Sequence, residues 1–384
     1  MAELLEYIAS ILFTLWAALI VVTWVRYDKL PHGKVLFILA WIWPLLLVED
    51  LLRISGMVHF LPFVVGAFYC IPLVIMIGLY LLINPLLMDQ PIQHKPLIYG
   101  GLAIIIAIQV PILVLSNADK TQLLFDQPIG LPLQNLPIYL AYWLSGLGIV
   151  AIGIRLVDVM QVYQRTLSEQ VVDINYYRVP AIIGLMATLV GIGFTAIVLT
   201  TVVAFGFVEF SWWQTTIHFS YASVILLILV LLLERRRYSP LPLDLEKLSK
   251  RIGDENLLRD TLARAEKAMI DRKAYKVIGL RIQQLADAAR VEPTNLAIAS
   301  HVLLNRNFRA FVYHYRLEYA KKVLMRTDAK VSAVARRLGF QSERFLSDMF
   351  IKYIEAMGAN AGNELADPID NQDDLLSNPS EGSQ

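Results

Sequence analysis

The residues of this sequence that are spaced for chemistry lie between Leu285 and Phe350. The chemistry that they suit is recognition of a surface by paired helices, because the same short pattern occurs twice. Leu285-Ala286, Arg290-Val291, Leu296 and Ala299-Ser300 recur as Val334-Ala335, Gly339-Phe340, Leu346 and Met349-Phe350, offset by 49 residues before the turn and 50 after it. An apolar residue followed by Ala allows close helix packing, and Pro293 or Ser342 suits the start of the next helix. Each copy predicts one helix-turn-helix unit.

A long amphipathic helix is expected between the two copies. Phe308-x-x-Phe311 and Tyr315-Arg316-Leu317-x-x-Ala320-Lys321-x-x-Leu324 repeat at helical spacing. Such a helix would hold the two units at a fixed separation.

These residues resemble a known family. Asn305-x-x-Phe308, Tyr315-Arg316-Leu317-x-x-Ala320-Lys321, Val334-Ala335 and Gly339-Phe340-x-Ser342 are similar to the DNA-binding domain of AraC/XylS bacterial transcription factors, over roughly residues 257–352, about a quarter of the chain. The resemblance implies that the second helix of each copy enters adjacent major grooves of double-stranded DNA. The alternative is a helical bundle with no role in nucleic-acid binding.

The resemblance also implies which residues read the DNA. They are Thr294, Asn295, Ala297, Ile298 and His301 in the first copy, and Ser342, Glu343, Arg344, Ser347 and Asp348 in the second. Where the family often carries Arg, this chain has Ile298 and Asp348. Apolar Ala297 and Ile298 suit thymine methyl groups, whereas Glu343 or Asp348 could accept a hydrogen bond from cytosine. The family's closing Gly-x-x-Pro is replaced by Glu355-Ala356-Met357-Gly358.

Charge separates the DNA-binding region from the rest. Residues 278–358 hold 13 Lys and Arg against 7 Asp and Glu, a balance of +6, in a chain whose net charge is +1. A basic surplus suits phosphate neutralisation. Residues 359–384 hold six acids and no bases, so we expect an acidic disordered tail. This tail could compete with DNA for the basic domain or simply be solvated.

Catalysis and metal binding have little support in the sequence. The single cysteine, Cys70, cannot form an intrachain disulfide or a cysteine metal cluster. The sequence shows no His/Glu metal cluster and no nucleophile elbow. We therefore expect neither an enzyme, nor a metal site, nor a cofactor.

The first 233 residues have the composition of a membrane domain. They hold 21 of the 67 charged residues, and seven apolar segments are long enough to span a bilayer. The segments are residues 5–25, 35–55, 59–83, 96–116, 136–157, 180–207 and 212–233. The fold class expected is therefore all-α: a seven-helix membrane bundle in contact with lipid, followed by a cytoplasmic all-α domain with two helix-turn-helix units.

Basic residues in short loops predict the orientation. One set of alternate loops carries ten Lys and Arg, and the opposite set carries only Arg53 and Lys120. The amino terminus is then outside and the carboxyl terminus in the cytoplasm, where DNA is. The expected location is the inner membrane of a bacterium.

A signal site is expected in the outer halves of the fifth and seventh segments. The candidates for a ligand pocket are Tyr142, Trp143, Trp213, His218 and Tyr221. Polar residues in a span are costly without partners. However, Trp and Tyr also gather at membrane interfaces, and hydroxyl groups also join helices.

Residues 234–276 are expected to link the domains, with the DNA-binding domain at 277–358. Leu258, Leu262, Ala265 and Met269 form a stripe for a partner helix, either in a homodimer or in the DNA-binding domain itself. The sequence thus predicts a membrane-embedded transcription regulator whose signal is unknown. The alternative is a transporter or membrane enzyme with a degenerate cytoplasmic domain.

Overall fold

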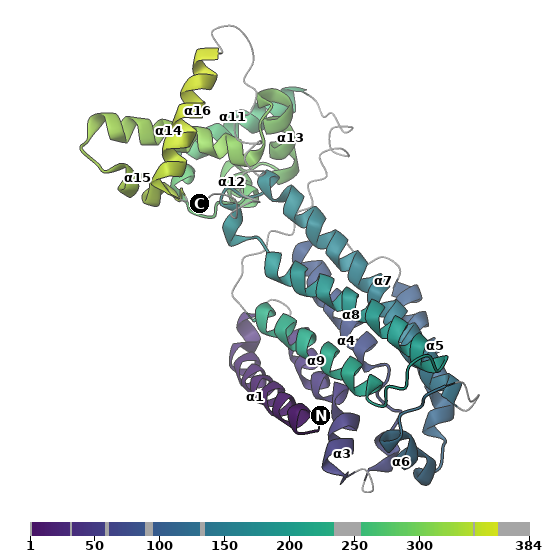
Figure 1. Cartoon of the computed structure of the whole chain (residues 1–384). Helices are drawn as coiled ribbons and strands as arrows, with labels where there is room; N and C mark the ends of the chain where they lie inside the picture. Colours follow the sequence, from purple (N-terminus) through teal and green to yellow (C-terminus); the bar gives the residue numbers. More distant parts are fainter. Residues whose placement is uncertain are drawn as a thin grey trace. The chain divides into compact units, whose positions relative to one another are not determined.

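The chain divides into two compact units (Figure 1). The computed structural model describes residues 2–30, 33–57, 61–88, 95–130, 135–233, 255–340 and 342–359. The first unit comprises Met1–Val162 and Val179–Arg236, and the second comprises Tyr163–Arg178 and Arg237–Gln384. The segment Tyr163–Arg178 therefore folds with the carboxyl-terminal unit, although the sequence places it between two apolar helices.

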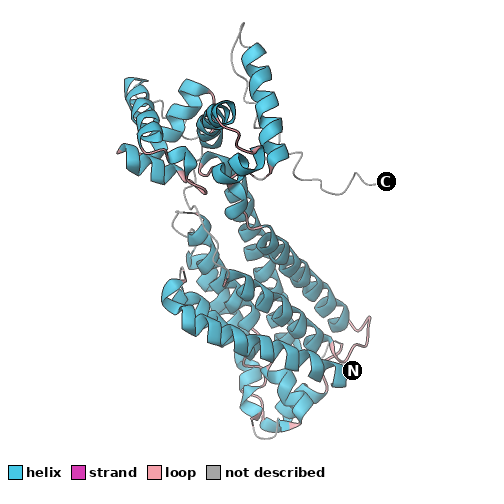
Figure 2. Ribbon diagram, turned by 90° about the vertical axis from the view of Figure 1, so that its left-hand side faces the viewer, coloured by secondary structure: helices cyan, strands magenta, loops and turns pink. Residues whose placement is uncertain are grey.

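The described ranges are predominantly helical and contain no β-strand (Figure 2). An isolated β-bridge pairs Val171 with Arg281. The prediction of an all-α fold is confirmed.

The first unit is built from helices, most of which are apolar. In chain order they are α1 (Ala2–Arg26), α2 (Gly33–Ile42), α3 (Val48–Ser55), α4 (Ile71–Leu87), α5 (Lys95–Leu113), α6 (Asn117–Phe125), α7 (Leu136–Thr166), α8 (Pro180–Ala204) and α9 (Trp213–Leu232). The 3₁₀ turn Trp43–Leu46, which contains Pro44, separates α2 from α3. Proline removes a backbone donor, which explains this break inside the second predicted span.

Five helical segments among the described residues are long and apolar enough to cross a membrane, or six if the bent pair α5 and α6 forms one span. They suggest membrane insertion of this region. All seven predicted segments contain helix, but two others besides the second differ from the expectation. The third, expected from residue 59, begins only at Ile71 and gives a helix of 17 residues. The fourth is followed by a bend of 109° into α6, where Ser116 accepts a hydrogen bond from the backbone N–H of Asp119.

The second unit consists of six helices in its described part. They are α11 (Glu255–Asp271), α12 (Ile282–Ala289), α13 (Pro293–Leu304), α14 (Phe308–Arg326), α15 (Val331–Leu338) and α16 (Glu343–Ala359). One apolar core joins all six. The stripe on α11 belongs to this core, where Leu258, Leu262, Ala265 and Met269 are at most 8% exposed. Of the two partners considered for that stripe, it packs on the DNA-binding domain itself. The acidic tail beyond residue 359 and residues 234–254 of the linker lie outside the described residues.

Candidate nucleic-acid interface

Two helix-turn-helix units lie where the duplicated pattern predicts them. The first is α12 with α13, and the second is α15 with α16. Both turns have a residue in the left-handed region, Arg290 with φ 56° and Gly339 with φ 77°. Glycine adopts this conformation without steric cost, whereas arginine does not. The second turn is therefore the less strained of the two.

Local capping explains why the helices begin where they do. Pro293 stands in the first turn of α13, a position that needs no backbone donor. The Ser342 hydroxyl accepts a hydrogen bond from the backbone N–H of Phe345 at 3.0 Å and so caps α16. Asn307 caps α14 by accepting from the N–H of Ala310 at 2.8 Å.

The linking helix α14 is amphipathic, as predicted. Phe308, Phe311, Leu317 and Ala320 are at most 2% exposed. Lys321 and Lys322 are exposed. This helix packs against both α13 and α15, so it can hold the two helix-turn-helix units at a fixed separation.

A histidine and a tyrosine on α14 and a tyrosine on α16 have shifted pKa values. Burial lowers the pKa of His314, and Arg306 acts in the same direction. Burial raises the pKa of Tyr315 to about 12. The pKa of Tyr353, whose hydroxyl donates to Glu318 at 2.5 Å, also rises to about 12, chiefly through burial. Both tyrosine hydroxyls therefore keep their protons to a higher pH than an exposed tyrosine does.

The predicted reading residues of the second copy stand on an open face. Ser342, Glu343, Arg344, Ser347 and Asp348 are all exposed. Ser342 caps α16 and the other four occupy its first two turns. The opposite face of this helix is anchored by Leu346 and Met349 in the core. This helix can present several polar side chains to a partner.

The first copy differs from the expectation. Ala297 is 1% exposed and Ile298 is 5% exposed, and both belong to the apolar core. The prediction that these two residues lie on the surface and contact thymine methyl groups is therefore wrong for this arrangement. Thr294 and Asn295 are partly exposed, and His301 is exposed. Three of the five predicted residues on α13 remain accessible.

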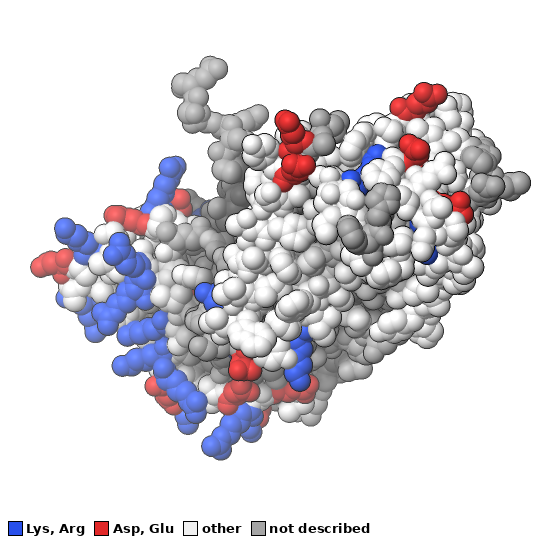
Figure 3. All heavy atoms as spheres, turned by 90° about the horizontal axis from the view of Figure 1, so that it is seen from below, with Lys and Arg blue, Asp and Glu red and all other residues white. Residues whose placement is uncertain are grey.

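Exposed basic side chains lie on α14 and α15 and on the residues next to them. Lys and Arg gather at one end of the view in Figure 3. The exposed basic residues of the second unit include Lys321, Lys322, Arg326, Lys330, Arg336, Arg337 and Arg344. They supply the positive surface that phosphate contacts require.

The predicted ligand-pocket residues of the first unit are brought together only in part. The Tyr142 hydroxyl lies 2.7 Å from Nε2 of His218, and Nδ1 of His218 lies 2.7 Å from a carboxylate oxygen of Asp50. The ring centroid of Trp213 is 4.9 Å from that of Tyr142. Tyr221 is also buried, whereas Trp143 is 41% exposed. The small hollow beside His218 and Glu49 has no room for a water molecule, so these residues form a filled polar core and not an open pocket.

Sequence reasoning missed the acidic partner in this core. Glu49 and Asp50, which the sequence analysis does not single out, are 6% and 3% exposed. The Glu49 carboxylate accepts from the backbone N–H of Gly66 at 2.9 Å. The signal that could have indicated this burial is a pair of acids next to an apolar run, with a histidine elsewhere in the apolar region.

Comparison with protein families identifies the carboxyl-terminal region. The family model described as a helix-turn-helix domain matches residues 285–357. This region is an AraC-type helix-turn-helix domain, as its motifs indicated. The searches of curated proteins and of solved structures return no match. A domain of this type supports DNA-binding transcription regulation, a role that is usually not enzymatic.

Proposed function

We propose that this protein is a membrane-embedded transcription regulator in which an apolar helical region senses a signal and the second unit binds specific DNA. The observation that carries the proposal is the exposed polar face at the start of α16, within an AraC-type domain. Its side chains offer both donors and acceptors for base edges in a major groove. The neighbouring basic residues on α14 and α15 suit the DNA backbone.

The reading residues that we assign are those left accessible on the two second helices. They are Thr294, Asn295 and His301 on α13, and Ser342, Glu343, Arg344, Ser347 and Asp348 on α16. The Ser342 side chain already caps its helix, so its contribution would be to fix the start of α16. Arg344 is the residue best suited to a guanine or a phosphate.

We place the apolar region in the inner membrane of a bacterium, with seven crossings, the amino terminus outside and the DNA-binding unit in the cytoplasm. The ten-to-two distribution of basic residues between alternate loops supports this orientation. The helices α4 and α5 would supply the two crossings beyond the five that satisfy length and hydropathy. A homodimer would place two DNA-binding units on one site.

The proposed sensor is the polar core around His218. Asp50, His218 and Tyr142 are linked by two hydrogen bonds of 2.7 Å inside an apolar unit. Because buried polar groups are costly without partners, a signal that repacks this network changes the relative stability of two arrangements of the helices. A ligand acts only if it binds one arrangement better than the other.

The test uses the full chain in lipid nanodiscs. Selection from a pool of random duplexes should enrich one sequence, and affinity for it should fall steeply as salt rises. Arg344→Ala should abolish the enrichment. Enrichment of no sequence, or an affinity independent of salt, would overturn the proposal.

A second candidate is favoured by the buried acids and histidine. Asp50, His218 and Glu49 are the residue types that carry protons in transporters, and a transporter could retain a degenerate cytoplasmic domain. Uptake of a labelled compound or of protons by vesicles containing the full chain, unaffected by Arg344→Ala, would support this alternative.

A further inference from the structure

The segment Tyr163–Arg178, which we call the docking loop, is built into the DNA-binding unit. Its backbone pairs with the residues before α12: the N–H of Val172 donates to Leu280 O at 3.1 Å, and Gln170 O accepts from the N–H of Ile282 at 2.8 Å. Val172 is fully buried in the apolar core of the unit, the same core that contains Ala297 and Ile298. The loop is thus packed as an integral element.

A buried ion pair fixes this loop. Arg316 on α14 is 0% exposed and donates to both carboxylate oxygens of Asp173, at 2.8 and 3.1 Å. Its other bonds go to the carbonyl oxygens of Tyr275 and Val277, at 2.8 and 2.9 Å. Asp173 also accepts from the N–H of Gly279 at 2.6 Å. Bidentate, buried pairing of this kind is directional and tolerates little displacement.

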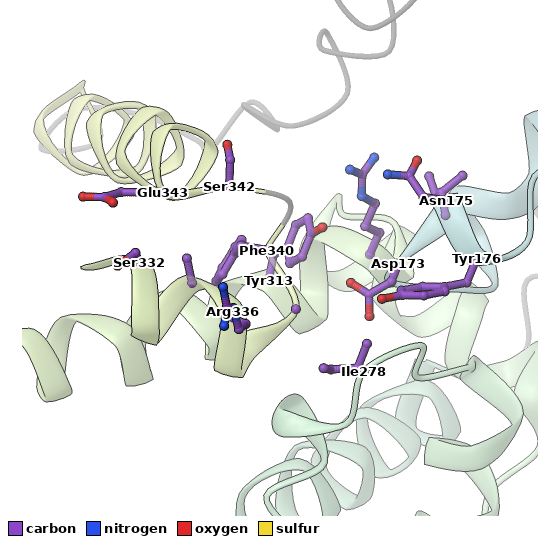
Figure 4. Close-up of a pocket in the computed structure, with 14 residues that line it drawn as sticks. Asp173, Asn175, Tyr176, Ile278, Tyr313, Ser332, Arg336, Phe340, Ser342 and Glu343 are labelled. Carbon is purple, nitrogen blue, oxygen red and sulfur yellow. The ribbon is translucent and has the colours of Figure 1, made fainter. Parts of the chain in front are cut away.

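The docking loop lies beside one predicted reading residue of the first copy and faces two of the second copy across a cavity. On α13, the ring of His301 is 3.8 Å from the carboxylate of Glu169. On the other side, Asn175 and Tyr176 line a cavity of about 600 Å³ together with Ser342 and Glu343, at the start of α16. Figure 4 shows Asn175 and Tyr176 on one side of this cavity and Ser342 and Glu343 on the other. A duplex that approached these residues would meet the loop.

We propose that the docking loop, held by Asp173 and Arg316, stands beside the DNA-reading surface and obstructs a duplex there, so that DNA binds fully only when the loop moves away. The inference rests on the proposed function and adds its regulation. The loop continues into α7 at one end and into α8 at the other. A rearrangement of these two apolar helices therefore acts on the loop directly through the chain. The obstruction to DNA in the unsignalled state is thus a segment of the same protein.

A reversible cross-link tests this arrangement. In a full chain with Cys70→Ala, Glu169→Cys and His301→Cys are joined by a short bis-thiosulfonate reagent in nanodiscs, which ties the loop to α13 and leaves Asp173 and Arg316 intact. Affinity for the selected duplex should be about tenfold or more lower in the cross-linked protein than after reduction, in the range of ordinary coupling between sites. Comparing the two forms of one protein removes the effect of replacing His301. The same reagent attached to His301→Cys alone, in a protein that keeps Glu169, measures how far the reagent itself obstructs DNA.

A matched control joins two helices without the loop. Glu318→Cys and Tyr353→Cys replace a hydrogen-bonded pair between α14 and α16, and their cross-link should leave affinity unchanged. Equal or higher affinity in the loop-locked protein would overturn the inference while leaving the proposed function intact. Absence of DNA binding in both the locked and reduced forms would instead refute the proposed function, and the inference with it.

Releasing the loop gives the converse result. Asp173→Asn removes the counter-ion of Arg316 and should raise DNA affinity, with faster hydrogen exchange in residues 163–178. This variant also destabilises the unit because Arg316 remains buried. The cross-linked protein keeps the ion pair, so its DNA affinity before and after reduction is the measurement that decides whether the loop obstructs binding.

Discussion

Substitutions in α13 and in α16, the second helices of the two helix-turn-helix units, should have different effects on stability and DNA affinity. Ile298 on α13 is 5% exposed and lies in the apolar core, whereas Arg344 on α16 is exposed. Ile298→Ala should therefore lower stability, because truncating a buried isoleucine typically costs about 2–5 kcal/mol. Arg344→Ala should leave stability within about 0.5 kcal/mol and weaken DNA binding by about 1–3 kcal/mol.

Hydrogen exchange of the full chain in nanodiscs separates these effects. A loss of about 2 kcal/mol corresponds to roughly thirtyfold faster exchange of the most protected amides, and it should appear in α12 and α13 of the Ile298 variant. The Arg344 variant should exchange like the unchanged protein but bind the selected duplex about 5- to 150-fold more weakly. Fluorescence anisotropy with the labelled duplex gives the affinities.

Val302→Ala is the matched control for the first copy. Val302 is also on α13 but is 53% exposed, so its truncation should change exchange little. If Ile298→Ala altered base preference while exchange stayed the same, Ile298 would have to meet the DNA. That result would refute the reasoning from its burial.

Further predictions concern the turns, pH and the polar cores. Gly339→Ala should lower the free energy of unfolding by about 1–2 kcal/mol because the φ of Gly339 is 77°. Arg290→Gly, at φ 56° in the other copy, should change it by less than about 1 kcal/mol. Thermal unfolding of the two variants measures both changes. Because burial lowers the pKa of His314, its contribution to stability should be complete above the unfolded pKa of about 6.5 and be lost as pH falls through the lower folded value. His314→Gln should remove that part of the acid dependence of the melting temperature. His218→Ala should destabilise the first unit by about 3–5 kcal/mol because Asp50 stays 3% exposed without its partner, whereas His218→Gln should cost less; the yield of monodisperse protein after heating reports the difference. Arg336→Ala, at an exposed position, should reduce the logarithmic salt slope of DNA binding by about 1.

Local features of the second unit were predictable from the sequence because their causes are local. The cap at Ser342, the proline at the start of α13 and the glycine in the second turn each act within a few residues. Helical periodicity similarly placed the apolar stripe of α14. The helix-turn-helix units therefore appear where the duplicated pattern predicted them.

What covers a helix face could not be predicted in this way. The resemblance assigned Ala297 and Ile298 to a reading face, but their burial depends on elements distant in sequence. Asp50 and His218 are 168 residues apart, and no periodicity relates them. The sequence placed the link between the domains in residues 234–276. The segment Tyr163–Arg178 also belongs to the second unit, and nothing in the helical periodicity indicated that.

One signal for the docking loop was present in the sequence. Val171-Val172-Asp173-Ile174 is an apolar run with a single acid inside a short connection. Exposed connections rarely contain such runs, so it favoured burial. Its partner Arg316, 143 residues later, was noticed only as part of the family motif.

A protein that binds specific DNA through α16 should occupy defined sites on a chromosome. Mapping the chromosomal sites occupied by the full-length protein in cells, beside the same protein carrying Arg344→Ala, tests this most directly. We predict a small set of sharp sites that share one sequence and disappear in the variant. Occupancy that is absent, or that is the same with and without Arg344, would contradict the account.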